Sequence, residues 1–244
     1  MFKKRLLRTF IFILCIILMF FSLNEVQADL YKKRNKIGIV YWHGDAEQNK
    51  ISLTFDDGPN PIYTPKILDI LKEYNIKATF FLIGKNVEAF PEIAKRIAQE
   101  NHSIGNHTYS HPELLLKKKE QIRYQIKKAE EAIIKATGIK PHLFRPPYGL
   151  DDPAVFLEVE KLGYAIVKWS VSAGNGRKDP EAEKITQKIL STTKNGAIIL
   201  MHDGERLIRN VDRSQLVKAL PIIIKTLKQQ GYEFVTIDEL LGLN

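Results

Sequence analysis

The sequence contains very little cysteine. Of its 244 residues only Cys15 is a cysteine, and it lies in an apolar stretch near the N-terminus. One cysteine cannot form a disulfide within a chain, and it cannot supply the several thiolates of a structural zinc site. The fold must therefore be held together by an apolar core. The composition allows such a core, because 44% of the residues are hydrophobic and 27% are charged.

Several other signatures are also absent from the sequence. No linker rich in proline, glycine or serine divides the chain, and we find no low-complexity tract and no internal repeat. The sequence has no Gly-x-Ser-x-Gly elbow of a serine hydrolase and no nucleic-acid recognition motif. The formal charge of +9 therefore suits an anionic polymer such as a cell envelope better than it suits nucleic acid.

Residues 1–28 have the pattern of a targeting segment. Basic residues at positions 3, 4, 5 and 8 precede an apolar region over residues 10–23, and Val26-Gln27-Ala28 resembles a cleavage site. We predict a signal peptide or an uncleaved N-terminal anchor, and hence an exported protein. Residues 29–50 are then a lead-in segment, and residues 51–244 form the main domain.

Strand-like and helix-like segments alternate along the rest of the chain. Apolar runs predict strands at 37–42, 51–55, 78–83, 103–107, 142–145, 164–169, 196–201 and 232–237. Helical spacing of apolar residues predicts helices at 64–74, 91–100, 117–137, 153–162, 181–190 and 214–230. The near-continuous apolar strands predict a parallel sheet covered by helices. Roughly 200 residues of such units favour an α/β barrel, closed or nearly closed, over an open doubly wound sheet.

Polar residues follow the ends of several predicted strands. These residues are Asp56, Asp57, His107, Arg145, Trp169, His202 and Asp203. In a barrel the C-terminal ends of the strands converge on one face, where active sites are built. We therefore expect these residues to form one site.

Asp56 and Asp57 are adjacent carboxylates at the end of one strand. Two like charges at close range raise the pKa of one of the two carboxyl groups, unless a cation or strong hydrogen-bond donors intervene. A metal ion on one carboxylate and a proton-transfer role for the other would resolve the repulsion. The alternative is an acidic turn, because Asp-Gly is common in turns.

His107 and His111 place two imidazoles four residues apart. Pro112 disfavours helix at His111, so we expect the pair on a single turn or loop. Together with Asp57 they offer two nitrogens and one carboxylate oxygen, a set that suits zinc and also accepts cobalt, nickel or iron. A chance pair of histidines is the alternative. We expect His102 to be solvated.

Arg145 begins a rigid segment, because Pro146 and Pro147 fix φ and remove two backbone donors. Arg145 could form an ion pair with Asp56, and the N–H of Tyr148 could face a developing oxyanion. The alternative is a stiff turn at the rim of the barrel with a surface salt bridge.

His202 follows an apolar strand in Leu200-Met-His202-Asp-Gly204 and could act as a general acid. A lone histidine in this position is also compatible with a purely structural role.

Four segments resemble, in this order, motifs of the polysaccharide deacetylase family, also known as the NodB-homology domain or carbohydrate esterase family 4. Residues 54–59, 107–111, 145–149 and 200–202 are similar to its first, second, third and fifth motifs. The resemblance implies that residues 51–244 are a catalytic domain with a distorted (β/α) barrel. It also implies metal-dependent removal of acetyl groups from N-acetylated or O-acetylated sugars.

The resemblance implies roles for the residues nearest the metal. Asp57, His107 and His111 would hold a divalent metal, with zinc the first choice and cobalt or nickel as alternatives. Asp56 would be the general base that takes a proton from the attacking water, and Arg145 would orient it.

The resemblance also implies roles on the substrate side. The backbone of Tyr148 would support the oxyanion, and His202 would protonate the departing amine. Leu200 would line the acetyl pocket, and Pro146 and Trp169 would contact the substrate.

The fourth motif of the family is altered in this chain. The usual pattern is Trp-Ser-Val-Asp followed shortly by Asp-Trp, whereas Ser172, Asn175 and Gly176 stand here in place of two acidic residues and a tryptophan. The loss of aromatic area bears on substrate choice more than on the reaction. Asp179 is the expected substitute for the carboxylate that raises the pKa of His202.

The function that this pattern predicts is a deacetylase acting on N-acetylglucosamine residues of peptidoglycan or a chitin-like glycan. One alternative is an acetyl ester hydrolase on xylan or a similar sugar, and another is a non-catalytic glycan-binding protein. The expected partner is the acetylated glycan, with no nucleic acid and no obligate protein partner. Contact with a membrane is expected only through residues 1–28, if they are not cleaved.

Overall fold

A curled parallel β-sheet organises the part of the chain that the structure describes. The computed structural model describes residues 40–150, 152–174, 179–205 and 212–243, which all belong to one unit beginning at Val40. The predicted signal segment, residues 1–28, lies outside the described residues, as do Asn175 and Gly176 of the altered motif.

Within these residues one sheet contains nine strands, in the order β1-β6-β5-β4-β3-β2-β8-β7, with β9 paired to β2. All strand pairings in this sheet are parallel, as the continuous apolar runs predict. The strands are β1 (Val40–Tyr41), β2 (Lys50–Gly58), β3 (Thr79–Leu82), β4 (Ser103–Asn106), β5 (Leu143–Phe144), β6 (Ala165–Val167), β7 (Val171–Ser172), β8 (Ile198–His202) and β9 (Glu233–Phe234).

The sheet curls into a distorted barrel because β6 and β7 are consecutive pieces of one stretch of chain. β6 pairs with β5, whereas β7 pairs with β8. Between them, the N–H of Ser170 donates to the carbonyl of Ile198 at 3.1 Å. The same stretch therefore connects the two sides of the sheet, and the predicted α/β barrel is confirmed in this distorted form.

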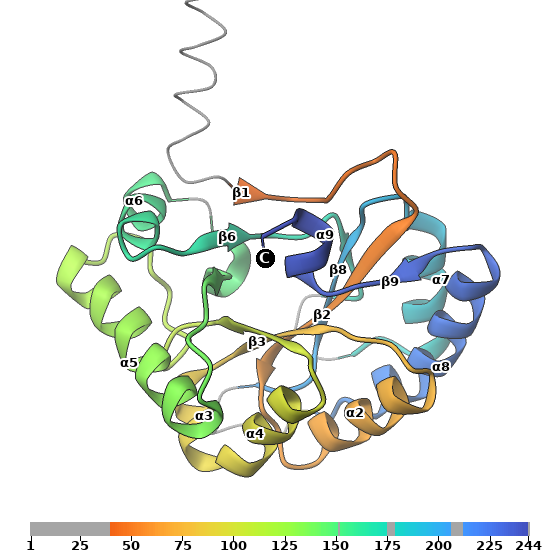
Figure 1. Cartoon of the computed structure of the whole chain (residues 1–244), viewed down its shortest axis with the longest axis horizontal. Helices are drawn as coiled ribbons and strands as arrows, with labels where there is room; N and C mark the ends of the chain where they lie inside the picture. The colour runs from red at the N-terminus through yellow and green to blue at the C-terminus, as the bar shows by residue number, and fades with distance from the viewer. Residues whose placement is uncertain (1–39, 151, 175–178, 206–211, 244) are drawn as a thin grey trace, which may run out of the picture. The chain divides into compact units, whose positions relative to one another are not determined.

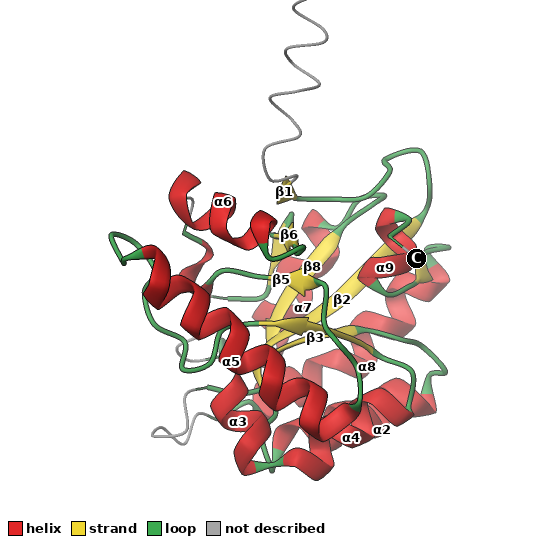
Figure 2. Cartoon of the chain, turned by 60° about the vertical axis from the view of Figure 1, so that its left-hand side comes forward, coloured by secondary structure: helices red, strands yellow, loops and turns green. Residues whose placement is uncertain are grey.

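Helices surround the strands (Figures 1 and 2). They are α2 (Tyr63–Glu73), α3 (Gly84–Ala89), α4 (Pro91–Gln99), α5 (Lys119–Thr137), α6 (Pro153–Lys161), α7 (Ala182–Thr192), α8 (Ser214–Gln229) and α9 (Ile237–Leu241). The longest of them, α5, buries Ile122, Ile126 and Ile133 at helical spacing and ends at Gly138, whose φ of +75° suits glycine. Its predicted position is confirmed.

The pleat of β2 divides its side chains between two environments. Leu53 and Phe55 belong to the large apolar cluster that includes residues of α2, α7 and α8. Residues Ser52, Thr54 and Asp56 alternate with them and are also buried. Asp56 therefore projects from the other side of the strand, toward the inside of the barrel.

Helix α9 was not predicted, because the strand predicted over residues 232–237 includes its first residue and no element was predicted after residue 237. It begins after Thr236, whose Oγ1 accepts from the N–H of Glu239, while Glu239 accepts from the N–H of Thr236 at 2.9 Å. The signal was present as the capping box Thr-x-x-Glu. Ile237 and Leu240 join an interior cluster with Phe81 and other apolar residues, so α9 packs against the inside of the barrel.

Helix α3 was also missed, because Gly84 follows β3 and resembles a strand terminator. A side chain at Gly84 would lie 2.8 Å from the Cα of Ala129 in α5, so glycine is needed here for close packing between the two helices. The prediction for His102 was wrong. Its side chain is buried, and its Nδ1 accepts from the N–H of Ala78 at 3.1 Å.

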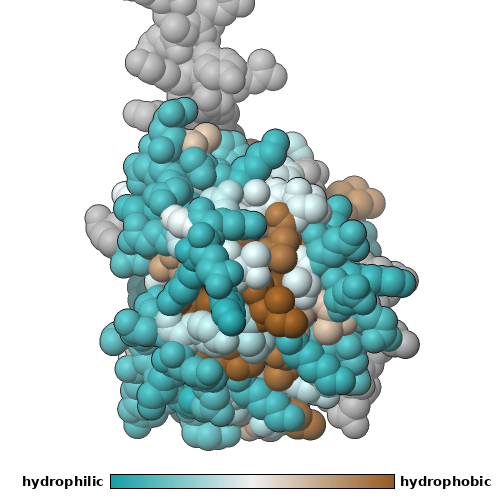
Figure 3. Space-filling view, turned by 90° about the vertical axis from the view of Figure 1, so that its right-hand side faces the viewer, coloured by the Kyte–Doolittle hydropathy of each residue, from teal (hydrophilic) through white to brown (hydrophobic). Residues whose placement is uncertain are grey.

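The described residues contain no helix that is long and apolar enough to span a membrane. On the face shown in Figure 3, polar side chains cover most of the surface and apolar side chains form a narrow band between them. Most of the apolar residues in the described part of the chain are buried in the interior.

Candidate active site

The C-terminal ends of four strands bring the four motif segments together. Asp56 lies near the end of β2 and is the register partner of His202, the last residue of β8. His107 follows β4, and Arg145 follows β5. The expectation that these segments meet at one end of the barrel is therefore confirmed for this arrangement of strands.

A β-bulge turns Asp57 toward the same side as Asp56. Neighbouring residues in a regular strand point to opposite faces. The pairing of β2 with β3 shifts between Asp56 and Gly58, and Asp57 has a φ of +74°. As a result, Asp56 Oδ2 lies 3.7 Å and Asp57 Oδ1 lies 3.5 Å from Nε2 of His107. The bulge is what allows two adjacent carboxylates to serve one site.

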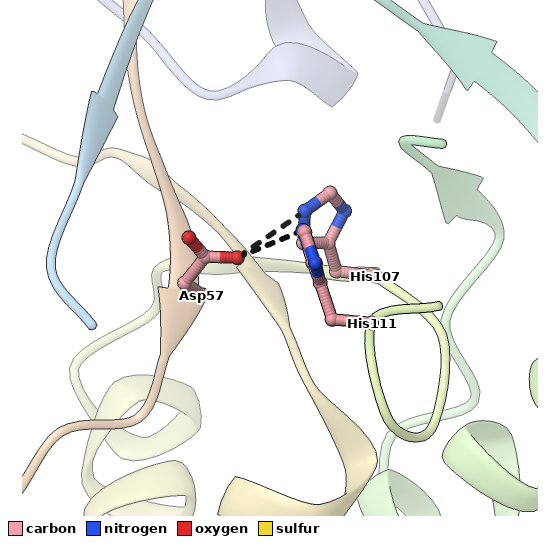
Figure 4. Close-up of side chains that lie close together, drawn as sticks. All are labelled: Asp57, His107 and His111. Atoms are coloured by element: carbon pink, nitrogen blue, oxygen red, sulfur yellow. Dashed lines mark ion pairs between the residues drawn. The ribbon is translucent and has the colours of Figure 1, made fainter. Parts of the chain in front are cut away.

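Asp57, His107 and His111 converge to within ligand distance of one another (Figure 4). Asp57 Oδ1 lies 3.2 Å from Nε2 of His111, in addition to its approach to His107. All three side chains are buried, and Asp57 Oδ1 has no hydrogen-bond donor among the described residues. Such an atom is costly unless a cation binds it.

The hydrogen bonding of His107 favours a cation in this position. Its Nδ1 lies 2.7 Å from the carbonyl oxygen of Arg145, so Nδ1 carries the hydrogen and Nε2 presents a lone pair. Burial lowers the pKa of His107 to about 3 and raises the pKa of Asp57. A neutral imidazole nitrogen therefore faces a carboxylate oxygen, and the residues present fit a divalent metal.

The loop that carries the two histidines has an unusual backbone. Thr108 has a φ of +67° and His111 a φ of +53°. Asn106 Oδ1 accepts from the N–H of Thr108 at 2.9 Å, and Thr108 Oγ1 accepts from the N–H of His111 at 3.0 Å. These bonds hold a conformation that costs free energy on its own, which is common at functional sites.

Arg145 is fully buried and contacts Asp56 directly. Its Nη1 donates to Asp56 Oδ1 at 2.7 Å and to Thr54 Oγ1 at 2.8 Å, while Nε and Nη2 donate to the carbonyls of Val167 and Lys168. Burial raises the pKa of Asp56, and the charge of Arg145 opposes this shift. The alternative of a surface salt bridge is therefore wrong.

Tyr148 lies beside the candidate metal ligands. Its backbone has a φ of +60°, its side chain is 54% exposed, and its ring meets the His111 ring edge-on at 4.7 Å between centroids. Pro146 is buried and Trp169 is half-buried. A side chain at Gly149 would lie 2.3 Å from the Trp169 ring, so these two residues pack tightly.

His202 and Leu200 occupy β8. Leu200 is 4% exposed and is the register partner of Thr54. Burial lowers the pKa of His202 to about 3, and the charge of Asp56 opposes this shift whereas that of Arg213 reinforces it. His202 is therefore neutral near pH 7 in the chain alone.

The structure does not bring Asp179 to His202. Asp179 Oδ1 accepts from Nη1 of Arg213 at 2.8 Å, and Asp179 Oδ2 accepts from the N–H of Leu216 at 3.2 Å. No hydrogen bond or ion pair joins Asp179 to His202 in the described part of the chain. Asp179 is therefore connected to the site by its ion pair with Arg213.

Sequence reasoning missed two buried residues around the site, Arg213 and Asn86, and it named Asp203 without giving it a role. Arg213 is fully buried and donates two hydrogen bonds to the carbonyl of Gly204. Asp203 is also fully buried, its Oδ2 lies 2.5 Å from Thr64 Oγ1, and burial raises its pKa to about 7. Asn86 donates to the carbonyl of Asp57 at 2.7 Å. Only Asp203, next to His202, had a positional signal in the sequence.

Comparisons with known proteins agree with this geometry. Residues 43–167 match a family described as polysaccharide deacetylase. A peptidoglycan-N-acetylglucosamine deacetylase of Bacillus cereus is 40% identical over 216 residues, which cover 87% of this chain and 97% of that protein.

Two solved structures are also similar. The Bc1960 peptidoglycan N-acetylglucosamine deacetylase has 40% identity and a TM-score of 0.78, over 84% of this chain and 94% of that one. BA3943 from Bacillus anthracis, a CE4 family pseudoenzyme, has 32% identity and a TM-score of 0.76, over 83% of this chain and 69% of that one. The motifs, the barrel and these relatives lead to one conclusion: the chain belongs to the polysaccharide deacetylase family.

Proposed function

We propose that this protein is a metal-dependent hydrolase that removes N-acetyl groups from N-acetylglucosamine residues of peptidoglycan or a chitin-like glycan and releases acetate. The observation that carries the proposal is the buried set Asp57, His107 and His111 beside the Asp56 and Arg145 ion pair. BA3943 has a similar fold but is a pseudoenzyme, so the fold alone is not sufficient evidence of activity. The proposal therefore depends on these side chains.

The metal site is proposed from the ligand set. Asp57, His107 and His111 would hold the ion, and two imidazole nitrogens with one carboxylate oxygen favour zinc, with cobalt or nickel as alternatives. A divalent ion held there supplies Lewis-acid chemistry, which polarises a carbonyl and makes water more acidic. Hydrogen bonding of His107 Nδ1 to the Arg145 carbonyl leaves the lone pair of Nε2 available and would orient the ring for the ion.

Asp56 is the proposed general base. Its carboxylate would take a proton from the water that attacks the acetyl carbonyl. Arg145 holds Asp56 Oδ1 at 2.7 Å, which leaves Oδ2 on the side of His107. The N–H of Tyr148 is the proposed donor to the oxyanion, and its left-handed backbone would set the direction of that N–H.

His202 is the proposed general acid, because an amide nitrogen leaves only when it is protonated. The pKa of His202 is about 3 in the chain alone, so His202 must gain a proton during the reaction. The proton that Asp56 takes from water is the proposed source, and Asp56 and His202 are register partners on β2 and β8. We place Leu200 at the acetyl pocket and Pro146 and Trp169 along the substrate. Asp179 would act through Arg213.

The partner of the proposed reaction is an acetylated glycan, and we propose neither nucleic acid nor an obligate protein partner. Peptidoglycan lies outside the cytoplasmic membrane, so the proposal requires export. Residues 1–28 would direct it as a signal peptide, or hold the protein at the outer face of the membrane as an anchor.

The test is acetate release from N-acetylglucosamine oligomers and from purified peptidoglycan, with zinc or cobalt added. Metal-dependent release that is abolished by His107→Ala supports the proposal. The control His102→Ala changes another buried histidine that lies outside the site, and it should retain the reaction. Release from an acetyl ester such as acetylated xylan, without release from any amide substrate, would favour the ester hydrolase instead. Glycan binding with no acetate release from any substrate would favour a binding protein.

A further inference from the structure

Lys168 has a buried side chain next to the segment that carries Tyr148. It directly follows β6, and only 1% of its surface is exposed. Lysine is almost never fully buried unless other groups compensate for the water that its charge loses. The contacts of its ammonium group therefore indicate the role of the residue. Lys168 lies outside the four segments that resemble family motifs, so the resemblance implies no role for it.

The ammonium group of Lys168 contacts both tryptophans of the sequence. Its Nζ lies 4.8 Å from the centroid of the Trp42 ring and 5.6 Å from the centroid of the Trp169 ring. A cation over an indole ring is attracted by the negative face of that ring, and the attraction is greater where water is excluded. The two rings therefore favour one position for the ammonium group.

Lys168 is also bonded to both ends of the segment that carries Tyr148. Its Nζ donates to the carbonyl oxygen of Gly149. Its own carbonyl oxygen accepts from Nη2 of Arg145 at 2.9 Å. One residue thus joins the guanidinium group at the start of the segment to the backbone at its end.

The backbone of this segment is strained. Tyr148 and Gly149 are consecutive residues with φ of +60° and +62°. A bulky residue rarely keeps a positive φ unless the surrounding contacts maintain it. The N–H of Gly149 donates to the carbonyl of Pro146 at 3.1 Å, and a side chain at Gly149 would lie 2.3 Å from the Trp169 ring. The turn therefore packs against a ring that also contacts the ammonium group of Lys168.

The N–H of Tyr148 is the proposed oxyanion donor, and this turn sets its direction. The turn lies close to the candidate metal site, because the Tyr148 ring meets the His111 ring at 4.7 Å between centroids. A misplacement of about 1 Å in an active site can lower the rate about 10²-fold. Contacts that fix the turn can thus affect the reaction without touching the substrate.

We propose that Lys168 is a positioning residue of the reaction. Its ammonium group, placed by Trp42 and Trp169, fixes the carbonyl of Gly149 and thereby directs the N–H of Tyr148 at the oxyanion. This inference rests on the proposed function, because it concerns the oxyanion donor of that reaction.

The first test is amide hydrogen exchange in the full chain, which requires no enzymatic activity. Two of the residues in 146–149 are prolines without an N–H, so this stretch reports only on Tyr148 and Gly149. Lys168→Met keeps the length of the side chain and removes the cation and the donor. Mass spectrometry should show exchange in this stretch that is about tenfold faster, because a hydrogen bond from a charged group is lost. Exchange in residues 107–111 should not change.

The second test is acetate release from N-acetylglucosamine oligomers with zinc added. Lys168→Met should lower kcat about ten- to a hundredfold, because a misdirected oxyanion donor loses part of the 10²–10³ that a whole donor contributes. KM should change less than about twofold, since this donor acts in the transition state. Lys168→Arg keeps a cation that can donate and can stack on tryptophan, so it should recover most of the lost kcat.

Lys66→Met is the matched control. It removes an exposed ammonium group that lies 5.7 Å from the centroid of the Tyr63 ring, on α2. The same substitution is thus made at another contact between a lysine and an aromatic ring. It should change neither kcat nor the exchange in residues 146–149.

Unchanged exchange in Lys168→Met overturns the proposal. Faster exchange with an unchanged kcat also overturns it, because Lys168 would then have only a structural role, and so does a rise in KM alone. If the wild-type chain releases no acetate, faster exchange supports the contact of Lys168 with the turn while the proposed reaction fails. If Lys168→Met does not fold, Lys168→Gln, which is shorter and uncharged, replaces it with the same expected results.

Discussion

Asp56 and Asp57 are neighbours in the chain, yet one oxygen of each lies within 3.7 Å of the same atom, Nε2 of His107. Their surroundings differ. Arg145 donates to Asp56, whereas Asp57 Oδ1 has no hydrogen-bond donor among the described residues and lies 3.2 Å from His111. The difference supports the proposed proton-transfer role of Asp56 and the proposed ligand role of Asp57.

Asp56→Asn and Asp57→Asn should therefore fail in different ways. Asp56→Asn should lower kcat by about 10²–10⁴, the usual contribution of a general base, while zinc still stabilises the protein. Asp57→Asn should lose most of the stabilisation by zinc, which for a site at 100 times Kd amounts to about 2.7 kcal/mol. Acetate release and thermal unfolding with and without zinc measure the two effects. Equal loss of zinc stabilisation in both variants would contradict the assignment.

His202→Ala should impair hydrolysis of an amide more than hydrolysis of an ester. An amine must be protonated before it leaves, whereas an alkoxide leaves more easily, so the general acid matters less for an ester. We expect the amide rate to fall by about 10²–10⁴ and the ester rate to fall by clearly less. The measurement is kcat/KM on an N-acetyl and an O-acetyl sugar of equal length. Equal losses of kcat/KM on both substrates would indicate that His202 positions the substrate and does not transfer a proton.

Arg145→Met should destabilise the fold strongly, because it leaves the buried Asp56 without its partner. The expected loss is about 3–5 kcal/mol in the free energy of unfolding, measured with urea and a chelator. Arg96 provides a matched control, since it pairs with Asp69 at 2.6 Å and with Glu100 at 2.7 Å near the surface. Arg96→Met should cost at most about 1 kcal/mol. Similar losses in the free energy of unfolding for Arg145→Met and Arg96→Met would contradict the prediction that the buried pair is the more important one.

His142 should make stability depend on pH. Its Nε2 lies 2.6 Å from Asp238 Oδ1, and the interaction with this carboxylate raises the pKa of His142 in the folded state. A raised pKa means that the contribution is fully present below the unfolded value of about 6.5 and is lost as the pH rises through the folded value. The difference in stability between wild type and His142→Gln should thus be larger at pH 5.5 than at pH 8.5.

Urea unfolding at the two pH values measures this difference. In an Asp238→Asn background the same His142→Gln change should show no such dependence, because the carboxylate that stabilises the charged ring is gone. Asp238 remains ionised at pH 5.5, since its own pKa is lowered. If the difference in stability between wild type and His142→Gln instead grew with pH, the predicted contribution of the His142 and Asp238 pair would be refuted.

The sequence by itself determined the local elements and their chemistry. Apolar runs located β2, β3 and β8, helical spacing and Gly138 located α5, and the order of four motifs indicated the family and the ligands Asp57, His107 and His111. Each strand, helix and single motif lies within about twenty residues, because strand pleat, helix period and turn chemistry act between near neighbours. The order of the motifs is read along residues 54–202. The capping box at Thr236 was an equally local signal that was not used, so α9 was missed.

Only the tertiary structure decided which of these groups meet. The bulge at Asp57 depends on how β2 pairs with β3, and the contact of Asp56 with Arg145 joins residues 89 positions apart. The same holds for His102, buried against the chain at Ala78, and for Asp179, which pairs with Arg213 rather than with His202. Burial and interactions between charges far apart in the sequence arise only when the barrel packs. Local sequence patterns therefore do not predict them.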